Sequence, residues 1–351
     1  MVPALAVAAA LRAEGAEVAF LGARGRAEAE IVPAAGYEID LLEIRGLDRR
    51  NPVRAAGAAR LAAAAVPAAR RALRARGAAT VLGGGGYVAG PAGLAALSLS
   101  LPLVLTEADR HLGLTNRLLA RRARRVCLAF PIAGRSGERY LVTGRPVPAS
   151  IGAADRAAAR ARFGIAAGDD CLLVFGGSQG ARSINLAALE AFAGADPAER
   201  GLHVLHISGS RDHETVRRRL EDAVDASRYT LIEFEPDLAE ALAACDLALA
   251  RAGGSIFELA AAGRPAILVP YPHAAGRHQH ANAEWMVEAG AALVLEDSEL
   301  TAARLRELVA ALFGDRERLA TMAAASLALA RPDAAARVAA EVLAAIGNPW
   351  G

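Results

Sequence analysis

The sequence predicts an α/β protein built from two doubly wound parallel-sheet domains. The chain has 351 residues, which is too long for one ordinary core and fits two domains of about 150 to 200 residues. Short apolar strand-like runs alternate with alanine-rich helical stretches through both halves. Repeated strand–loop–helix units imply parallel sheets covered on both faces, with ligands at the carboxyl ends of the strands. Two such halves would face each other across a cleft.

Composition narrows the class of protein. The net charge is +2, which argues against a dedicated nucleic-acid partner. The cysteines Cys127, Cys171 and Cys245 lie in apolar strand-like runs without metal or redox spacing, so we expect reduced core residues of a cytosolic protein. Glycines and prolines interrupt the charge-free run 78–106, which favours strand, loop, helix and strand over a transmembrane helix.

The first half alternates helices and strands. Pro3 suits the first turn of a helix, where its missing N–H is not needed. The elements expected after it are a helix over Ala4–Glu14, strands at Val18–Leu21 and Gly36–Ile44, a helix over Val53–Arg76, a strand at Thr80–Leu82, a helix from Pro91, a strand at Leu103–Leu105 and a helix over Leu114–Arg121.

The second half repeats the pattern after a break at Gly144–Ser150, which is typical of a linker between domains. Its expected strands are Cys171–Phe175, Val204–Ile207, Thr230–Ile232, Leu247–Ala250 and Ala266–Val269, with a helix from Ser183 and closing helices over Ala302–Phe313 and Ala334–Ile346.

The passage from residue 247 to residue 263 predicts a site for phosphate and sugar. The strand 247–250 runs into Gly253 and Gly254, and a helix follows with Ser255 in its first turn and Glu258 one turn in. Helix N-terminal N–H groups can donate to phosphate oxygens, and glycines allow a close approach. A carboxylate one turn in can accept hydrogen bonds from ribose hydroxyls. The alternative is an ordinary strand-to-helix turn that binds no ligand, because it has the same local pattern.

Two further segments point to a sugar nucleotide. The loop 176–182 lacks the Lys-Ser/Thr of an NTPase phosphate loop and the usual dinucleotide fingerprint. Backbone amides, Ser178 and Gln179 would hold a diphosphate there. The segment 270–282 contains three histidines, but no general-base glutamate in a metalloprotease arrangement, so we expect no metal. Hydrogen bonds from Gln279 and Asn282 to sugar hydroxyls are favoured, with helix-capping surface histidines as the alternative.

These motifs together resemble the MurG family of GT-B-fold glycosyltransferases. The matching stretches are Gly83–Tyr87 with Gly90 and Pro91, Gly113–Arg117, Gly176–Arg182, Glu258 with Ala260–Gly263, and Pro270 with His273, His278, Gln279, Asn282 and Ala283. The family moves GlcNAc from UDP-GlcNAc to lipid-linked N-acetylmuramyl-pentapeptide in peptidoglycan synthesis, a step of cell-wall biogenesis that serves cell shape and division. The resemblance covers essentially the whole chain.

The resemblance implies two Rossmann-like domains. Residues 1–146 would form the acceptor domain, residues 147–168 the linker and residues 169–330 the UDP-GlcNAc domain, with a C-terminal helix in 331–351 that packs back on the first domain. It also implies a peripheral enzyme at the cytoplasmic face of the membrane, without a cofactor. An arginine-studded helix over 53–76 would contact an anionic membrane surface, although a solvated helix has the same pattern.

The resemblance further implies roles for single residues. The donor-binding set is Ser178 and Gln179 on the diphosphate and sugar, Phe234 and Glu235 around the uracil, Gly253, Gly254 and Ser255 on phosphate, Glu258 on the ribose, and His278 and Gln279 on GlcNAc hydroxyls. The acceptor-binding set is Gly85, Gly86, Tyr87 and Asn116.

The chain departs from the family pattern in several places. It has Thr106–Asp109 where the family has His-Glu-Gln-Asn, and Gly144–Pro148 where the family has Gly-Asn-Pro-Val-Arg. The loop before Glu258 is one residue short. We expect an inverting displacement in which amides stabilise the leaving diphosphate, with Glu107 and Asp109 as the candidate general bases.

The family's first glycine loop, Gly-Gly-Thr-x-Gly-His, has no counterpart, and the chain opens on residues that match those after that histidine. We therefore expect the reading frame upstream of Met1 to encode a strand and this loop, with the histidine as the likelier base in the family. The 351-residue form would then express poorly and turn over little substrate. Two alternatives stay open, a UDP-GlcNAc 2-epimerase-like enzyme and an inactive nucleotide-sugar-binding relic.

Overall fold

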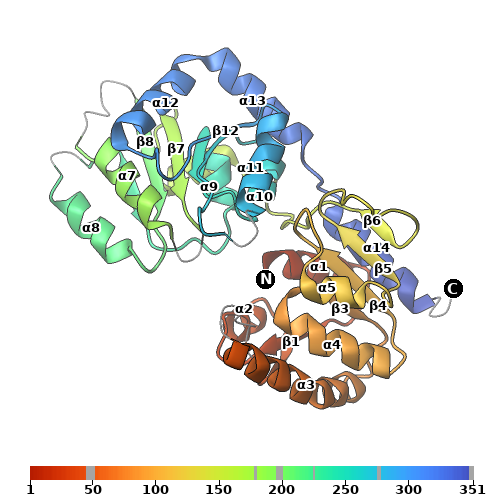
Figure 1. The fold of residues 1–351 in the computed structure, drawn as a ribbon. Helices are drawn as coiled ribbons and strands as arrows, with labels where there is room; N and C mark the ends of the chain where they lie inside the picture. Colours follow the sequence, from red (N-terminus) through yellow and green to blue (C-terminus); the bar gives the residue numbers. More distant parts are fainter. Residues whose placement is uncertain (45–51, 178–179, 195–200, 224–225, 275–277, 348–351) are drawn as a thin grey trace. The chain divides into compact units, whose positions relative to one another are not determined.

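A computed structural model describes residues 1–44, 52–177, 180–194, 201–223, 226–274 and 278–347. The chain divides into two compact units, Met1–Pro148 with Arg331–Gly351, and Ala149–Ala330. Both units are α/β with parallel sheets, as the sequence predicted (Figure 1).

The first unit contains two parallel sheets that share a core. Four strands form one sheet in the order β3 (Val81–Gly83), β4 (Leu103–Glu107), β5 (Arg125–Leu128), β6 (Tyr140–Val142), and β1 (Ala19–Ala23) pairs with β2 (Glu38–Leu42) in the other. Ala23 and Leu42 lie in the same apolar cluster as Leu103 and Leu105. Strand residues of both sheets are therefore buried in one core, which is what stabilises such short strands.

Small residues let the helices of this unit pack closely. The helices are α1 (Val2–Ala13), α2 (Glu28–Ala34), α3 (Pro52–Ala75), α4 (Gly86–Ser98), α5 (Leu114–Leu119) and α14 (Ala334–Gly347). Ala69 of α3 and Ala95 of α4 are fully buried where these helices lie side by side (Figure 1). Val338 of α14 shares a cluster with Val7 of α1, so the last helix completes the core of the first unit.

Helix α4 begins five residues before Pro91, where the sequence analysis began it. Gly85 and Gly86 have φ values of 78° and 73°, so the chain turns through these glycines and enters the helix at once. Pro91 is therefore inside α4, and the prediction of its start was wrong.

The second unit has a six-stranded parallel sheet. Its order is β12 (Ala292–Val294), β11 (Ala266–Leu268), β10 (Leu247–Ala250), β7 (Asp170–Phe175), β8 (Leu202–Ile207), β9 (Tyr229–Ile232). The chain builds from β7 toward one edge and then from β10 toward the other. The strand order thus reverses between β7 and β10, and ligands of open α/β sheets bind at such a switch point.

Eight helices are assigned among the described residues of this unit: α6 (Arg156–Arg162), α7 (Arg182–Phe192), α8 (His213–Glu221), α9 (Ala239–Ala244), α10 (Ile256–Ala261), α11 (His278–Glu288), α12 (Ala302–Gly314) and α13 (Arg316–Ala328). The segment 149–168 belongs to this unit. Arg156 of α6 donates to the carbonyls of Ala243, Ala244 and Cys245 and pairs with Asp246 at 2.6 Å. This arginine caps the carboxyl end of α9.

The three cysteines are free and buried, as expected for core residues. Burial raises the pKa of the Cys127 thiol to about 12 and that of Cys245 to about 11. In the part of the chain that the structure describes, no helix has the length and apolar character needed to cross a membrane.

Candidate active site

Loops with unusual backbone requirements meet at the switch point of the second sheet. Phe175 at the end of β7 is the register partner of Ala250 at the end of β10. Ile207 of β8 lies beside Phe175 on the other side, and Leu268 of β11 lies beside Ala250. Segments far apart in sequence, which carry nearly all the predicted donor residues, therefore emerge along one edge of the sheet.

The loop after β7 accepts only glycine at two described positions. An added Cβ on Gly176 would lie 2.4 Å from the Ala181 nitrogen, and one on Gly180 would lie 2.1 Å from the Ser208 carbonyl oxygen. Gly180 also has a φ of +75° and donates its N–H to the Gly177 carbonyl at 2.8 Å. Both contacts are with backbone, so neither neighbour can move aside. The predicted diphosphate ligands Ser178 and Gln179 lie outside the described residues.

This loop leads directly into the first turn of α7. Ala181 occupies the N-cap and makes no side-chain cap hydrogen bond to the described residues, and the first turn contains no acidic residue. A helix start of this kind leaves N–H groups that can donate to an anion.

The loop after β10 is held by Arg251, which the sequence analysis did not single out. Its guanidinium donates to Asp297 at 2.5 Å, to the Ser183 hydroxyl at 2.8 Å and to the Val269 carbonyl at 3.2 Å. Ser183 also donates to Asp297 at 2.7 Å. This arginine therefore ties the start of α7 to the loops after β10, β11 and β12.

The predicted phosphate and ribose residues follow Arg251. The Ile256 N–H donates to the Gly253 carbonyl at 3.4 Å and the Phe257 N–H to the Gly254 carbonyl at 3.3 Å. These turns carry the chain past Ser255 into the short helix α10. Ser255 is the N-cap of α10 and Glu258 is half-buried in its first turn, whereas the sequence analysis had placed Ser255 in the first turn and Glu258 one turn further in.

The start of α11 approaches the same loop. An added Cβ on Gly253 would lie 4.0 Å from the Gln279 Nε2 atom, while Gln279 Oε1 accepts the Tyr271 N–H at 2.8 Å. His278 is half-buried in the first turn of α11. Asn282 is buried and donates to the Ala252 carbonyl at 3.1 Å, so its side-chain nitrogen holds the glycine loop.

The predicted uracil residues follow β9. Phe234 is 52% exposed, so its ring is accessible to a ligand. Glu235 is buried and its carboxylate pairs with Arg162 of α6 at 2.7 Å. The side chain of Glu235 is therefore engaged with α6, and its backbone is what this residue can offer a base.

In the first unit, Glu107 organises the loop after β4. Its carboxylate accepts the N–H groups of Ala108, Asp109 and Gly113 at 3.0, 3.2 and 2.8 Å, and the Asn116 amide at 2.9 Å. Four donors on two oxygens satisfy the carboxylate, so Glu107 acts here as a fixed cap for the turn. Asp109 lies half-buried in the turn that this cap holds.

Glycines and a buried amide meet beside that turn. An added Cβ on Gly85 would lie 3.4 Å from the Asn116 Nδ2 atom, and the Thr115 hydroxyl donates to the Gly86 carbonyl at 2.8 Å. Asn116 is 1% exposed and its Oδ1 atom has no partner in the part of the chain described. An unpaired buried acceptor costs free energy unless a ligand or water donates to it. Tyr87 is half-buried in the first turn of α4.

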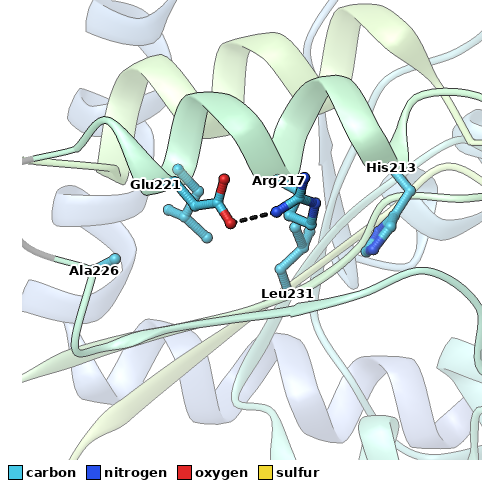
Figure 2. A pocket seen from close by; sticks show the side chains of 6 residues that line it. His213, Arg217, Glu221, Ala226 and Leu231 are labelled. Atoms are coloured by element: carbon cyan, nitrogen blue, oxygen red, sulfur yellow. Dashed lines mark hydrogen bonds and ion pairs between the residues drawn. The ribbon is translucent and has the colours of Figure 1, made fainter.

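A separate cavity of about 320 Å³ lies beside α8. Figure 2 shows Arg217 and Glu221 of α8 paired along one wall of this cavity, with His213 at the start of the same helix and Leu231 of β9 opposite. Among the residues that the structure describes, no member of the predicted donor or acceptor sets lines it. We place the candidate site at the strand ends because the glycine loops and open N–H groups are there. The described residues also contain no group of three or more metal-ligating side chains.

Comparison with family models identifies both halves. Residues 1–128 match the glycosyltransferase family 28 N-terminal domain and residues 171–338 match the glycosyltransferase family 28 C-terminal domain. A protein of Moorella thermoacetica named UDP-N-acetylglucosamine--N-acetylmuramyl-(pentapeptide) pyrophosphoryl-undecaprenol N-acetylglucosamine transferase is 40% identical over 345 residues, which are 95% of this chain and 92% of that protein. A protein of the same name from Acidithiobacillus ferrooxidans is 42% identical over 349 residues, which are 99% of this chain and 94% of that protein.

The chain belongs to the MurG family of glycosyltransferases. The crystal structure of Acinetobacter baumannii MurG superposes with a TM-score of 0.73 at 30% identity, over 97% of this chain and 95% of that one. The fold is therefore GT-B, as predicted. A UDP-GlcNAc 2-epimerase of Neisseria meningitidis, bound to UDP-GlcNAc, has a TM-score of 0.68 at 16% identity over 98% of this chain and 96% of that one. That likeness shows the fold alone.

Proposed function

We propose that this MurG-family enzyme transfers GlcNAc from UDP-GlcNAc to lipid-linked N-acetylmuramyl-pentapeptide in cell-wall biogenesis, and so contributes to cell shape and division. The observation that carries the proposal is the pairing of Phe175 with Ala250, which sets two glycine loops side by side in a chain 40% identical to an enzyme named for this transfer.

The donor would lie across the carboxyl ends of β7, β9, β10 and β11. Amides at the start of α7, with Ser178 and Gln179, would hold the diphosphate together with Gly253, Gly254 and Ser255. Phe234 and the Glu235 backbone would frame the uracil, and Glu258 would accept the ribose hydroxyls. His278 and Gln279 would contact GlcNAc. The open first turn of α7 supports this placement, because a helix N-terminus stabilises negative charge.

The acceptor would bind the first unit at the carboxyl ends of β3 and β4. Gly85, Gly86 and Tyr87 present the first-turn N–H groups of α4, which suit an acceptor phosphate. The unpaired Asn116 Oδ1 supports the placement, since it would accept a hydrogen bond from a substrate hydroxyl or amide.

The reaction would be an inverting displacement. An acceptor hydroxyl attacks the anomeric carbon from the face opposite UDP, the bond to the diphosphate breaks, and a carboxylate removes the hydroxyl proton. Of the two candidate bases we assign this role to Asp109, because the carboxylate of Glu107 already accepts four N–H donors. A general base accelerates such a step by about 10²–10⁴-fold. Charge on the leaving diphosphate would be stabilised by helix-terminal amides.

Access to a lipid-linked acceptor calls for a membrane-facing surface. We place it on α4 and α5, where Leu94, Leu114 and Leu118 are exposed, with Leu118 at 68%. Arg117, Arg121 and Arg122 are exposed beside these leucines. Exposed leucines among arginines suit the interface of an anionic cytoplasmic leaflet. Arg76, which follows α3 and ends the arginine-studded segment 53–76, pairs with Glu38 and Asp40, so this one arginine is less suited to bind lipid.

The test is incubation with radiolabelled UDP-GlcNAc, with and without a short-chain lipid-linked muramyl-pentapeptide. The proposal predicts label in the lipid product and UDP release that depends on the acceptor. Label in UDP-ManNAc without acceptor would replace the proposal with the epimerase. UDP-GlcNAc that binds and stays intact with both substrates present would indicate the inactive relic.

A further inference from the structure

A buried hydrogen-bonded chain lies under the donor loop and plays no part in the reaction as described. We call Tyr229, His206 and Asn185 the buried chain. The Tyr229 hydroxyl lies 2.7 Å from His206 Nδ1, and His206 Nε2 lies 3.0 Å from Asn185 Oδ1. All three side chains are buried. They connect the edge strand β9, through β8, to the first half of α7.

The donor and the acceptor of each hydrogen bond can be assigned by starting from Asn185. Asn185 Nδ2 donates to the Ser208 carbonyl at 2.8 Å and to Asp212 at 3.3 Å, so Asn185 Oδ1 must accept from His206. His206 is therefore the neutral tautomer that carries its proton on Nε2, and its Nδ1 accepts the Tyr229 hydroxyl. Burial lowers the pKa of His206 to about 3, which agrees with a neutral ring.

The buried chain ends against the glycine loop. The Ser208 carbonyl that Asn185 holds is the atom 2.1 Å from an added Cβ on Gly180, and Asn185 Nδ2 itself is 3.3 Å from that point. Gly180 thus rests on the carbonyl and amide that the buried chain fixes. Asp212, the second acceptor of Asn185, also pairs with Arg182 at 3.3 Å. Through these contacts the buried chain positions both the turn at Gly180 and the first turn of α7.

We propose that His206 and Tyr229 are positioning residues for the donor diphosphate, acting through Asn185 on Gly180 and the start of α7. The inference rests on the proposed function for the identity of the ligand. Tight binding of a nucleoside diphosphate then requires that Tyr229 donates to His206 and that His206 donates to Asn185. Neither residue touches substrate.

The strands provide a matched control. Thr230, next to Tyr229 on β9, makes a similar hydrogen bond to a histidine of β8, His203, at 2.9 Å. Thr230 then donates to the Phe163 carbonyl at 3.0 Å, which leads away from the glycine loop. Tyr229→Phe and Thr230→Val each remove one hydroxyl that is bonded to a histidine, but only the first lies on the buried chain.

The experiment measures the Kd of UDP by calorimetry on the full chain, the KM for each substrate, and the Tm. We expect Tyr229→Phe and His206→Leu to weaken UDP binding about tenfold, equal to about 1.4 kcal/mol, and to raise the KM for UDP-GlcNAc without changing the KM for the acceptor. His206→Gln offers an amide N–H toward Asn185 and an oxygen toward Tyr229, so it should recover most of the affinity. Thr230→Val should lower the Tm and leave the Kd unchanged.

Equal UDP affinity in Tyr229→Phe and Thr230→Val at similar Tm would overturn the inference and leave the proposed function standing. A wild-type chain that does not bind UDP would instead overturn the proposed function. If His206→Leu fails to fold, Tyr229→Phe decides, because it deletes a single hydroxyl and keeps the ring.

Discussion

At the scale of single residues, Glu258 offers the most direct probe of the donor site. It is half-buried in the first turn of α10, just after the glycine pair. Glu258→Ala should lose about 1.5–3 kcal/mol of UDP-GlcNAc binding, the range for a charged hydrogen bond. Calorimetry checks this, with Glu284→Ala as a control because Glu284 is an exposed carboxylate on α11. Unchanged donor affinity in Glu258→Ala would remove the ribose role.

Variants of Glu107 and Asp109 distinguish the positioning role proposed for Glu107 from the catalytic role proposed for Asp109. Glu107→Gln replaces an oxygen that accepts N–H groups with an amide that donates, so about 1–3 kcal/mol of stability should be lost. Asp109→Asn should keep the Tm and lower kcat by about 10²–10⁴-fold. Thermal melts and steady-state rates on both variants make the comparison. Full activity in Asp109→Asn would exclude this carboxylate as the base.

At the scale of elements, the loop after β7 makes a steric prediction. Gly180→Ala should lower the Tm and weaken UDP binding, because its Cβ would lie 2.1 Å from the Ser208 carbonyl oxygen. Gly164→Ala is the control, since Gly164 has a similar φ of +70° and no described atom within 4 Å of the added Cβ. Its cost should be backbone strain alone, about 1–2 kcal/mol. Equal effects of the two variants on Tm and on UDP affinity would mean that the contact is unimportant.

A single substitution tests the proposed membrane-facing surface on α4 and α5. Leu118→Glu should weaken co-sedimentation with anionic vesicles at least tenfold, because about 1.5–3 kcal/mol of leucine burial is lost and a like charge is added. The control is Leu327→Glu on α13, the same substitution at a leucine that is 57% exposed on the second unit. This variant should sediment as the wild type does. If both variants sediment as the wild type does, the surface lies elsewhere.

At the scale of the whole molecule, the sequence predicted strands best where an apolar run leads into a glycine-containing loop. Leu247–Ala250 has the bounds of β10, and Cys171–Phe175 lies within β7. For β5 it indicated only that Cys127 lies in an apolar strand-like run and gave no bounds. It did not predict β6, because Tyr140 begins a strand of three residues that polar residues flank. β5 pairs with β4, and β6 pairs with β5; these pairings depend on contacts distant in sequence, which override local preference.

Some residues of the candidate site could likewise be predicted from the sequence, and others could not. Glycine loops and Glu258 could be read from spacing, since strand, glycine and helix follow one another along the chain. Arg251 could not, because its partners Ser183 and Asp297 are 68 and 46 residues away. The cap formed by Glu107 was missed for a different reason. Spacing shows a carboxylate beside a possible acceptor, and only the folded turn shows that its oxygens are already used. The strand and histidine expected upstream of Met1 stay a prediction.

The central claim is that the chain forms a new glycosidic bond between GlcNAc and a lipid-linked muramyl acceptor by direct displacement. Proton NMR of the isolated disaccharide product tests this claim most directly, because it reports both the bond and the configuration at the anomeric carbon. Donor UDP-GlcNAc has the α configuration, so the account predicts a β-linked GlcNAc on the acceptor. An α-linked product, or GlcNAc recovered without a bond to the acceptor, would contradict it.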